Sequence, residues 1–297
     1  MAVASDAREA IASGRRPGSG LRPVDRLLLG YLAFISAVVL VRPEATGHGW
    51  LLLSNGLSGL LILLLARDGL GRLGRGLREV YPILLLTALY GALDILNGGG
   101  AVPVHDPLVR RWEAALLGGQ PSRDWWRAAP SPLWSTVLHG AYVSYYAIVL
   151  VPAVLLLVQG RLGALRSFVL SLMATFVFCY VWFVLFPVAG PYYEFARPTG
   201  AFVENPMARL VYATLAAGSS YGAAFPSSHV AASVAATISA WRASRALGMA
   251  LVLPTALLTV GVVYCQMHYA VDAIAGLLVG AVIALAVTSY ELRVTER

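Results

Sequence analysis

The chain contains no lysine, because all 22 of its basic residues are arginine. Chemistry that needs a lysine amine is therefore excluded, whether as a Schiff base, as a phosphate-loop cation or as a general base. Charge is also scarce: 12% of the 297 residues are charged, against about 25% in ordinary soluble domains. Hydrophobic residues make up 58% of the chain, and the mean hydropathy is +0.71. This balance indicates a membrane protein.

The formal net charge of +7 does not indicate a nucleic-acid partner. The arginines stand singly or in pairs between long apolar runs, which is typical of the loops of a membrane protein. Cysteine is nearly absent as well. Cys179 and Cys265 both lie within apolar stretches, so we expect small buried hydrophobic residues rather than a disulfide or a redox pair.

The apolar runs predict an all-α integral membrane protein with about eight transmembrane helices of about 20 residues each. The expected spans are 24–41, 50–66, 80–96, 133–158, 164–187, 227–246, 248–267 and 269–289. The connection over 97–132 has mixed charge and predicts short amphipathic helices at the membrane interface. Four tryptophans in or beside it are expected to be interface anchors rather than a sugar- or choline-binding platform: Trp112, Trp125, Trp126 and Trp134.

Arginine counts predict the topology. The two terminal regions and the connections after the second, fourth and sixth spans hold 15 arginines, and the other four connections hold 7. By the positive-inside rule, both termini are then cytoplasmic and the odd-numbered connections face outward. The candidate functional residues concentrate in these outward connections.

One candidate cluster opens the sixth span. Pro226 suits a helix start, Ser227 or Ser228 can cap it, and the free N–H groups of the first turn can bind an anion. His229 lies in that first turn. A simple helix cap with an interfacial histidine is the alternative interpretation.

A second cluster lies between the seventh and eighth spans. His268 and Asp272 are four residues apart, so on a helix they share a face and the carboxylate can orient the imidazole. An oriented imidazole can act as a nucleophile or a general base. An ion pair that stabilises the helix start is the alternative.

A third cluster follows the fifth span, where Arg197 stands on a proline-bounded turn and can hold a phosphate by paired hydrogen bonds. Snorkelling of the side chain to the interface is the alternative. All three clusters fall on the same side in the predicted topology. Together they contain the groups needed for phosphoryl transfer through a phosphohistidine.

The residues at these places resemble a known family. Pro-Ser-Ser-His at 226–229 and His-Tyr-Ala-Val-Asp at 268–272 resemble the second and third signature blocks of the type 2 phosphatidic acid phosphatase superfamily. Arg197-Pro198 resembles the end of its first block. The resemblance covers about 80–290 and implies a catalytic membrane domain there, with the family's six-helix core in spans three to eight. The two helices of 24–79 are then an N-terminal addition, and 1–23 is a cytoplasmic tail.

The chain departs from the family pattern at its basic positions. The lysine of the first block falls on Gly190, and the Ser-Arg of the third block falls on Gly261 and Val262. Ser228 replaces the glycine of the second block. A branch that includes inositol phosphorylceramide synthases and sphingomyelin synthases keeps both histidines and the aspartate while relaxing the basic positions.

The resemblance implies that His268 attacks phosphorus and that Asp272 holds its tautomer. His229 then protonates the leaving alcohol and deprotonates the acceptor that resolves the intermediate. The resemblance implies neither a metal nor a cofactor.

For the phosphate, the resemblance implies binding by Arg197, Ser227, Ser228 and the first N–H groups of the helix. Other donors would have to replace the missing cations, and four residues are near enough in sequence to be candidates: Tyr192, Tyr193, Tyr264 and Gln266. A further set of polar residues forms either a stripe facing the substrate or buried interhelical hydrogen bonds: Asp94, His139, Tyr142, Tyr145 and Tyr146.

Several functions stay open at this point. The leading one is a lipid phosphate or diphosphate phosphatase with its site on the extracytoplasmic side of the plasma membrane, where water resolves the intermediate. A headgroup phosphotransferase shares the first half-reaction and differs in its acceptor. A polytopic transporter would use Asp and His as a proton relay, although the sequence shows neither paired repeats nor helices broken at mid-span.

A zinc enzyme built on His229, His268 and Asp272 is the remaining alternative, but the sequence has no His-Glu-x-x-His or multi-histidine box. The expected partners are a lipid phosphate and the bilayer, without nucleic acid.

Overall fold

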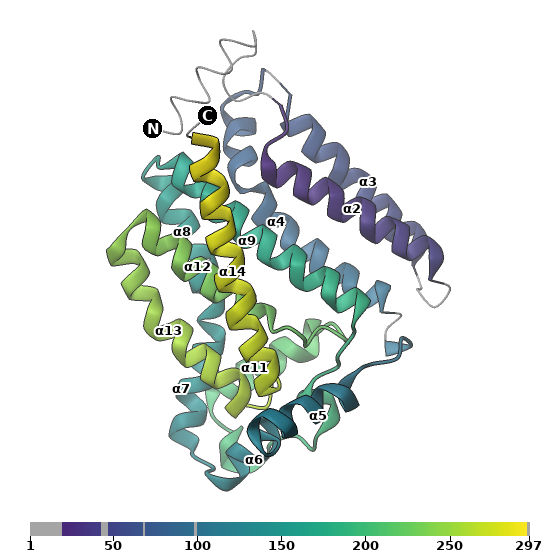
Figure 1. Ribbon diagram of the computed structural model, residues 1–297, viewed down its shortest axis with the longest axis vertical. Helices are drawn as coiled ribbons and strands as arrows, with labels where there is room; N and C mark the ends of the chain where they lie inside the picture. The colour runs from purple at the N-terminus through teal and green to yellow at the C-terminus, as the bar shows by residue number, and fades with distance from the viewer. Residues whose placement is uncertain (1–19, 43–46, 68, 98–99, 296–297) are drawn as a thin grey trace.

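The computed structural model describes residues 20–42, 47–67, 69–97 and 100–295, and this part of the chain is helical without a strand (Figure 1). Its one strand-like pairing is a bridge between Val188 and Ala223. The all-α class predicted from the sequence is confirmed. The predicted tail 1–23 lies, up to residue 19, outside the described residues.

The helices follow the order of the predicted spans. The first three are α2 (Pro23–Val41), α3 (His48–Leu65) and α4 (Arg72–Leu96). The tryptophan-rich connection forms the two short helices α5 (Asp106–Leu117) and α6 (Pro121–Ala128). The remaining elements are α7 (Pro132–Val143), α8 (Tyr145–Val158), α9 (Leu162–Leu185), α10 (Pro191–Glu194), the 3-10 helix η2 (Gly200–Phe202), α11 (Pro206–Gly218), α12 (Ser228–Ala243), α13 (Arg245–Tyr264) and α14 (Ala270–Thr295).

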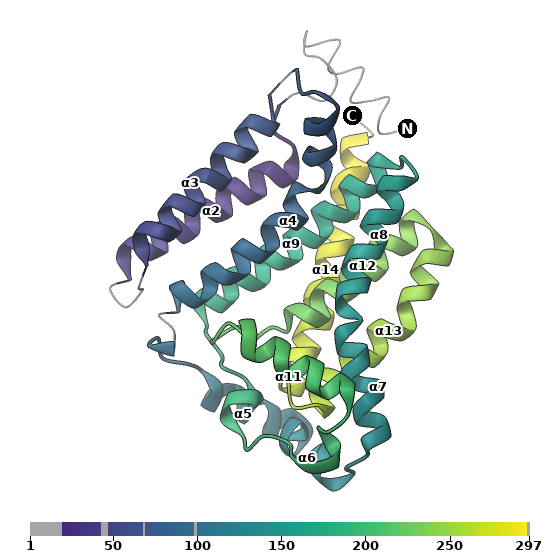
Figure 2. The ribbon, with the colours of Figure 1, turned by 180° about the vertical axis from the view of Figure 1, so that it is seen from behind.

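Seven helices in the described residues are long and apolar enough to cross a membrane: α2, α3, α4, α7 with α8 as one unit, α9, α13 and α14. The chain is therefore an integral membrane protein. The remaining predicted span, 227–246, forms α12, which has 16 residues. Helix α12 is the central helix of the bundle and packs against α8, α9, α13 and α14 (Figures 1 and 2).

Close packing of α12 against α14 depends on two glycines. A Cβ atom on Gly276 would lie 2.6 Å from the carbonyl oxygen of Ser227, and one on Gly280 would lie 2.3 Å from that of Ala231. Small residues four apart let membrane helices approach this closely. Because α12 begins with the predicted Ser-His block and α14 begins beside His268, this contact sets the relative position of the candidate residues.

Helix α7 passes into α8 at Ser144, within a stretch predicted as a single unbroken span, 133–158. Backbone hydrogen bonds from Ser144 N to Gly140 O and from Ile148 N to Ser144 O, both 2.9 Å, continue across the junction. The Ser144 hydroxyl also donates to Ala141 O at 2.6 Å, and a hydroxyl that bonds back to its own helix can bend it. The predicted span 133–158 is therefore one membrane-crossing unit, Pro132–Val158, that contains the junction at Ser144.

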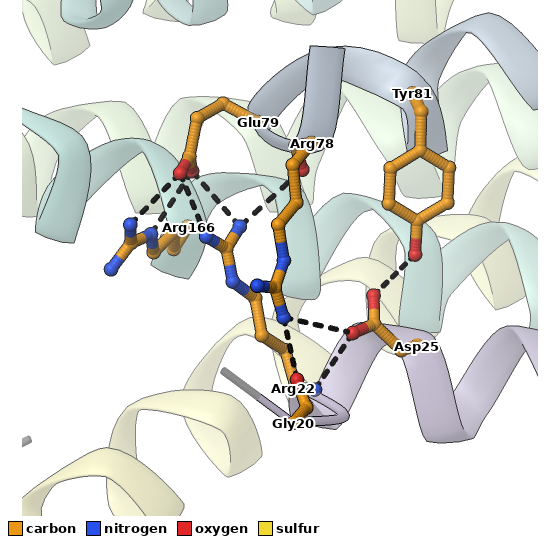
Figure 3. Close-up of polar contacts among 7 residues, drawn as sticks. All are labelled: Gly20, Arg22, Asp25, Arg78, Glu79, Tyr81 and Arg166. Atoms are coloured by element: carbon orange, nitrogen blue, oxygen red, sulfur yellow. Dashed lines mark hydrogen bonds and ion pairs between the residues drawn. The ribbon is translucent and has the colours of Figure 1, made fainter. Parts of the chain in front are cut away.

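The hairpin α2–α3 lies along α4 and α9 on one flank of the bundle (Figures 1 and 2). Figure 3 shows the ionic cluster that holds its first end, formed by Gly20, Arg22, Asp25, Arg78, Glu79, Tyr81 and Arg166. Glu79 accepts forked hydrogen bonds from Arg22 and Arg166, with shortest distances of 2.8 Å to each guanidinium. Asp25 accepts the Arg22 N–H at 2.7 Å and the hydroxyl of Tyr81.

The other end of the hairpin is held by Arg42. Its guanidinium donates to the carbonyl oxygen of Leu96 at 3.0 Å and to that of Val184. These carbonyls belong to the last turns of α4 and α9, which lack intrahelical partners. The hairpin is thus tied to the same two helices at both ends. The division into an added hairpin, 24–79, and a catalytic domain, 80–290, stays a prediction.

The cysteines and tryptophans can now be placed. Both cysteines are buried and free, as predicted. Three of the tryptophans contact the protein itself: the ring of Trp112 stacks on Phe186 at 5.8 Å between centroids, Trp125 lies edge-on to Tyr264, and Trp126 donates to Gln266. Trp134 is exposed. The interfacial connection is therefore packed onto the loops of the bundle.

Candidate active site

His268 lies in the turn that joins α13 to α14. The carbonyl oxygen of Val262 accepts the N–H groups of Met267 and His268, at 2.9 and 2.8 Å, which folds the chain back after α13. Gln266 has a left-handed φ of +61° in this turn, a conformation that a non-glycine residue adopts only when its surroundings enforce it. The nucleophile candidate therefore stands on a strained turn between the two helices, as its place between the seventh and eighth predicted spans indicated, and not on the helical face that the four-residue spacing suggested.

Asp272 approaches His268 from the first turn of α14. Its Oδ2 atom lies 3.5 Å from His268 Nδ1 and accepts the N–H of Tyr269 at 2.8 Å. The same Nδ1 atom lies 3.0 Å from the carbonyl oxygen of Ala224. Asp272 is fully buried, and His268 is 5% exposed. Burial lowers the pKa of His268 to about 4, so its imidazole is neutral near pH 7.

His229 faces His268 across the site, with 5.8 Å between ring centroids. Its Nε2 atom lies 3.2 Å from the hydroxyl of Tyr142. The rings of Tyr142 and Tyr145 lie 4.8 and 4.6 Å from the imidazole. These two tyrosines flank the junction at Ser144, so that junction lies against one of the two histidines.

Ser227 is the N-cap of α12, as predicted, and its hydroxyl oxygen accepts the N–H of Val230 at 3.4 Å. Its own N–H donates to the carbonyl oxygen of Asp272 at 3.0 Å. Ser228 is the first residue of the helix and is also buried. This backbone hydrogen bond ties the start of α12 to the start of α14, and thereby connects the two halves of the site.

Arg197 lies on the loop that adjoins this cluster. Its side chain is exposed, and the guanidinium lies over the ring of Tyr192 at 4.2 Å. Gln266 connects the loop to the turn that carries His268, because its amide donates to the carbonyl oxygen of Ala196 at 3.1 Å. The structure therefore gathers the two histidines and Asp272 with the start of α12, and places Arg197 at the neighbouring loop.

Helix α5 supplies two carboxylates that sequence reasoning missed. Asp106 accepts the N–H groups of Ala189 and Gly190 and the hydroxyl of Tyr269, and Glu113 accepts the N–H of Ala270. Their spacing of seven residues on an amphipathic helix is a sequence signal that they share a face. What the sequence does not show is that this face meets the turn carrying His268.

These contacts bring together residues that lie far apart in the sequence: an imidazole backed by a carboxylate, a second imidazole facing it, and a helix N-terminus between them. Residues 110–286 match the model of the PAP2 superfamily. The chain belongs to the PAP2 superfamily. The matched region contains both histidines, Asp272 and the loop of Arg197. Membership supports an enzyme of the phosphatase or phosphotransferase type. Comparisons with curated proteins and with solved structures give no match.

Steric reasons accompany the departures from the PAP2 pattern. Gly190 has a φ of +92°, and a Cβ atom there would lie 2.9 Å from Cβ of Ala224. A Cβ on Gly261 would lie 2.9 Å from the carbonyl oxygen of Leu138. Val262 is fully buried in the apolar core. The backbone at these positions is packed where the PAP2 pattern has basic or polar side chains.

The residues suggested as replacements for the missing cations mostly hold the scaffold. The Tyr264 hydroxyl donates to Ala129 O at 2.7 Å, and that of Tyr193 lies 2.8 Å from the hydroxyl of Ser219. Gln266 accepts hydrogen bonds from the indole of Trp126 and from Arg127, at 2.9 and 3.3 Å. The turn that carries His268 is thereby held against α6.

The set of polar residues on the third and fourth predicted spans divides into two groups. Asp94 and His139 make structural hydrogen bonds: Asp94 accepts the N–H of Tyr221 at 3.3 Å, and His139 Nδ1 lies 2.8 Å from Ser135 O. Tyr142 and Tyr145 face His229, as described above, whereas Tyr146 is exposed.

The part of the PAP2 chain that the structure describes contains no group of three or more His, Cys, Asp or Glu side chains arranged to hold a metal ion. Independence of metal stays a prediction.

Proposed function

We propose that the chain is a membrane phosphoesterase that cleaves a lipid phosphate or diphosphate through a phosphohistidine. The orientation of His268 carries the proposal. Its Nδ1 atom lies 3.0 Å from the carbonyl oxygen of Ala224, which can only accept a hydrogen bond. Neutral His268 therefore has its proton on Nδ1, and Nε2 keeps the lone pair that a nucleophile needs.

In the first step, Nε2 of His268 attacks phosphorus and forms a P–N bond. The P–O bond to the lipid alcohol breaks, and the leaving oxygen takes a proton from His229, whose imidazolium form the negative charge of the bound phosphate stabilises. In the second step, His229 takes a proton from water while the water oxygen attacks phosphorus. The P–N bond then breaks, which releases phosphate and His268. Asp272, 3.5 Å from Nδ1, stabilises the positive charge that the ring of His268 carries in the intermediate.

The phosphate oxygens need donors in this mechanism. In the first turn of α12, Val230 N donates to the Ser227 hydroxyl oxygen and Ala231 N to Ser227 O. The preceding N–H groups, of Ser228 and His229, have no intrahelical acceptor and are assigned to the phosphate. The hydroxyl proton of Ser227 and the guanidinium of Arg197 complete the proposed site.

A headgroup phosphotransferase is the second candidate. The first step is the same, and a lipid alcohol replaces water in the second. The observation that favours it is the packing of Gly190 and Val262, which provide no cation where the PAP2 pattern has one. A site with fewer cations binds a free phosphate dianion less strongly. The advantage of complete hydrolysis, which produces this dianion, over transfer of a substituted phosphate is therefore smaller.

We propose that the site faces the extracytoplasmic side of the plasma membrane and that both termini are cytoplasmic. The arginine counts support this orientation. The short helices α5, α6 and α11 gather at the end of the bundle that holds the catalytic turn, away from the start of α2 and the end of α14 (Figures 1 and 2). We expect a tag placed at either terminus to react with a membrane-impermeant reagent only from the cytoplasmic side. Labelling of such a tag from outside would reverse the assigned orientation.

The deciding experiment incubates the purified full chain with phosphatidic acid, a prenyl diphosphate, phosphatidylinositol or phosphatidylinositol with ceramide, and identifies every product. Inorganic phosphate from a lipid phosphate or diphosphate supports the phosphatase. Transfer of a headgroup to ceramide without release of phosphate would replace it with the transferase. His268→Ala should abolish either activity, and His48→Gln, in α3 and outside the matched region, should leave it unchanged.

Trapping the intermediate tests the assignment of the nucleophile. With a phosphate ester that is labelled in its phosphorus and whose leaving alcohol is acidic enough to depart without a proton from His229, His229→Ala should accumulate a labelled protein whose bond is stable to base and labile to acid. His268→Ala should accumulate none. Unchanged turnover in His268→Ala would refute the site, and substrate transport without turnover would favour a carrier.

A further inference from the structure

Helix α5 buries two carboxylates that have no part in the phosphoryl transfer described above. Asp106 and Glu113 are each 0% exposed and lie with Val109 on the buried face of this interfacial helix. Burying a carboxylate is unfavourable unless hydrogen bonds compensate it, and apolar side chains at such places are often more stabilising. The groups that Asp106 and Glu113 bind must therefore compensate for the burial of both carboxylates.

Asp106 joins two segments of the candidate active site. Its Oδ1 atom accepts the N–H of Gly190 at 2.8 Å and the hydroxyl of Tyr269 at 2.9 Å, and its Oδ2 atom accepts the N–H of Ala189 at 2.7 Å. Tyr269 directly follows His268. Gly190 belongs to the segment that pairs with Ala224 through Val188, and Ala224 O contacts the imidazole of His268.

Glu113 holds the next residue of the same turn. Its Oε1 atom accepts the N–H of Ala270 at 2.6 Å, at the first position of α14. A carboxylate at a helix N-terminus stabilises the helix. Its Oε2 atom is buried without a hydrogen-bond partner among the described residues, and burial raises the pKa of Glu113 to about 7.

We propose that Asp106 and Glu113 are positioning residues, and that α5 fixes Tyr269 and Ala270 so that the turn presents His268 to the phosphorus atom. The inference rests on the proposed function, because it assumes that His268 is the nucleophile. It makes an interfacial helix a functional part of the active site. Neither carboxylate touches the reacting atoms. Asp106 acts through the hydroxyl of Tyr269 and the N–H groups of Ala189 and Gly190, and Glu113 acts through the N–H of Ala270.

Asp106→Asn tests the proposal because it replaces one acceptor oxygen by an NH₂ group that faces donors. Tyr269→Phe tests the same contact more gently, since it removes one hydrogen bond and leaves the backbone bonds intact. Asp124→Asn is the matched control: this carboxylate lies on the adjacent α6, is exposed and pairs with Arg123. Each variant is prepared as the full chain in lipid nanodiscs and checked for folding by its thermal transition.

Two probes separate positioning from general damage. Orthovanadate adopts the five-coordinate geometry of attack and so depends on where His268 stands, whereas inorganic phosphate depends on the donors alone. We expect Asp106→Asn to weaken vanadate binding and to slow phosphoenzyme formation from dioctanoyl phosphatidic acid by about 10- to 100-fold, because a misplacement of about 1 Å has effects of that size. Phosphate affinity and KM should stay within about twofold, a change of less than about 0.5 kcal/mol.

Tyr269→Phe should weaken vanadate binding and slow phosphoenzyme formation less than Asp106→Asn does. The double variant Asp106→Asn with Tyr269→Phe should lose less binding free energy for vanadate than the two single losses added together, because both changes break the same contact. Glu113→Gln keeps an acceptor oxygen for Ala270 and should be mild, whereas Glu113→Ala should resemble Asp106→Asn. The positioning role would be refuted if vanadate binding and the rate of phosphoenzyme formation were unchanged in Asp106→Asn, Tyr269→Phe and Glu113→Ala. Equal losses of vanadate and phosphate binding would refute it too.

His268→Ala distinguishes this inference from the proposed function. If His268→Ala binds vanadate like the unmodified chain, the nucleophile assignment fails and the positioning role fails with it. If His268→Ala loses vanadate binding while the α5 variants keep it, the proposed function stands and only the inference about α5 is overturned.

Discussion

Gly280→Ala is a small change with a large expected effect. Gly280 lies on α14 where that helix meets α12, and an added Cβ atom would stand 2.3 Å from the carbonyl oxygen of Ala231 and 3.0 Å from Cβ of Val234. Ordinary contact begins near 3.4 Å. The two helices must therefore separate by about 1 Å at this point, since backbone oxygen cannot turn aside as a flexible side chain can.

The expected loss of stability in Gly280→Ala follows from comparison with a glycine whose added Cβ atom would meet no neighbour. A Cβ atom on Gly91, on α4, meets nothing within 4 Å, so Gly91→Ala gains helix propensity without overpacking. That gain is common to both variants and cancels between them. What remains is overpacking in a close-packed interface, which costs about 1–3 kcal/mol. Gly280→Ala should be the less stable variant by that amount.

Activity should fall along with stability, because α12 carries His229 and α14 carries Asp272. A displacement of about 1 Å between them is expected to reduce kcat by up to about 100-fold. The assay compares thermal unfolding of the purified variants in one detergent and then their turnover at a temperature where both are folded. The reasoning is refuted if Gly280→Ala matches Gly91→Ala in both measurements.

Three further changes test other parts of the structure. Glu79→Ala leaves Arg22 and Arg166 without their shared carboxylate and should cost about 3 kcal/mol in thermal unfolding; a loss below 1 kcal/mol would show that the cluster in Figure 3 is not stabilising. Because burial lowers the pKa of His268 to about 4, kcat/KM should be lost as the pH falls through about 4, and an acid limb at 6.5 would contradict the neutral buried nucleophile. Burial raises the pKa of Glu113 from 4.5 to about 7, so the native state holds the extra proton and loses stability as the pH rises between these values. Glu113→Gln should therefore gain about 1–3 kcal/mol relative to the unmodified chain between pH 4.5 and pH 8, and an equal difference at both pH values would rule this out.

Much of the fold follows from local pattern. The length of the apolar runs predicted most ends of the long helices within three residues, because one face or all faces of each helix must be apolar in a bilayer. Helix α4 begins eight residues before the predicted start and α14 ends six residues after the predicted end, because both continue into polar sequence that the apolar pattern does not include. Pro226 and Ser227 predicted the start of α12, since the first turn of a helix needs outside acceptors for its N–H groups. The junction between α7 and α8 at Ser144 was not predicted, because a single hydroxyl in an apolar run does not change the pattern.

The sequence likewise predicted one part of the candidate site and not another. The order and spacing of His229, His268 and Asp272 in the sequence indicated which side chains would meet, and the structure brings these side chains together. The spacing was wrong about the local geometry, because His268 stands on a turn before α14 rather than on its face. A turn held by contacts from α6 and α5 has no signature in the residues that form it.

By itself, the sequence determined the class of the protein, the places of its long helices and the set of side chains able to carry phosphoryl transfer, because each of these depends on neighbouring residues. The tertiary structure alone decided that Asp106 would meet Tyr269, 163 residues away, and that Glu113 would meet Ala270, 157 residues away. It also decided that Gly190 would lie where no side chain fits. Contacts at such separations depend on how the helices pack, and the hydrophobic pattern of a single chain leaves that packing open.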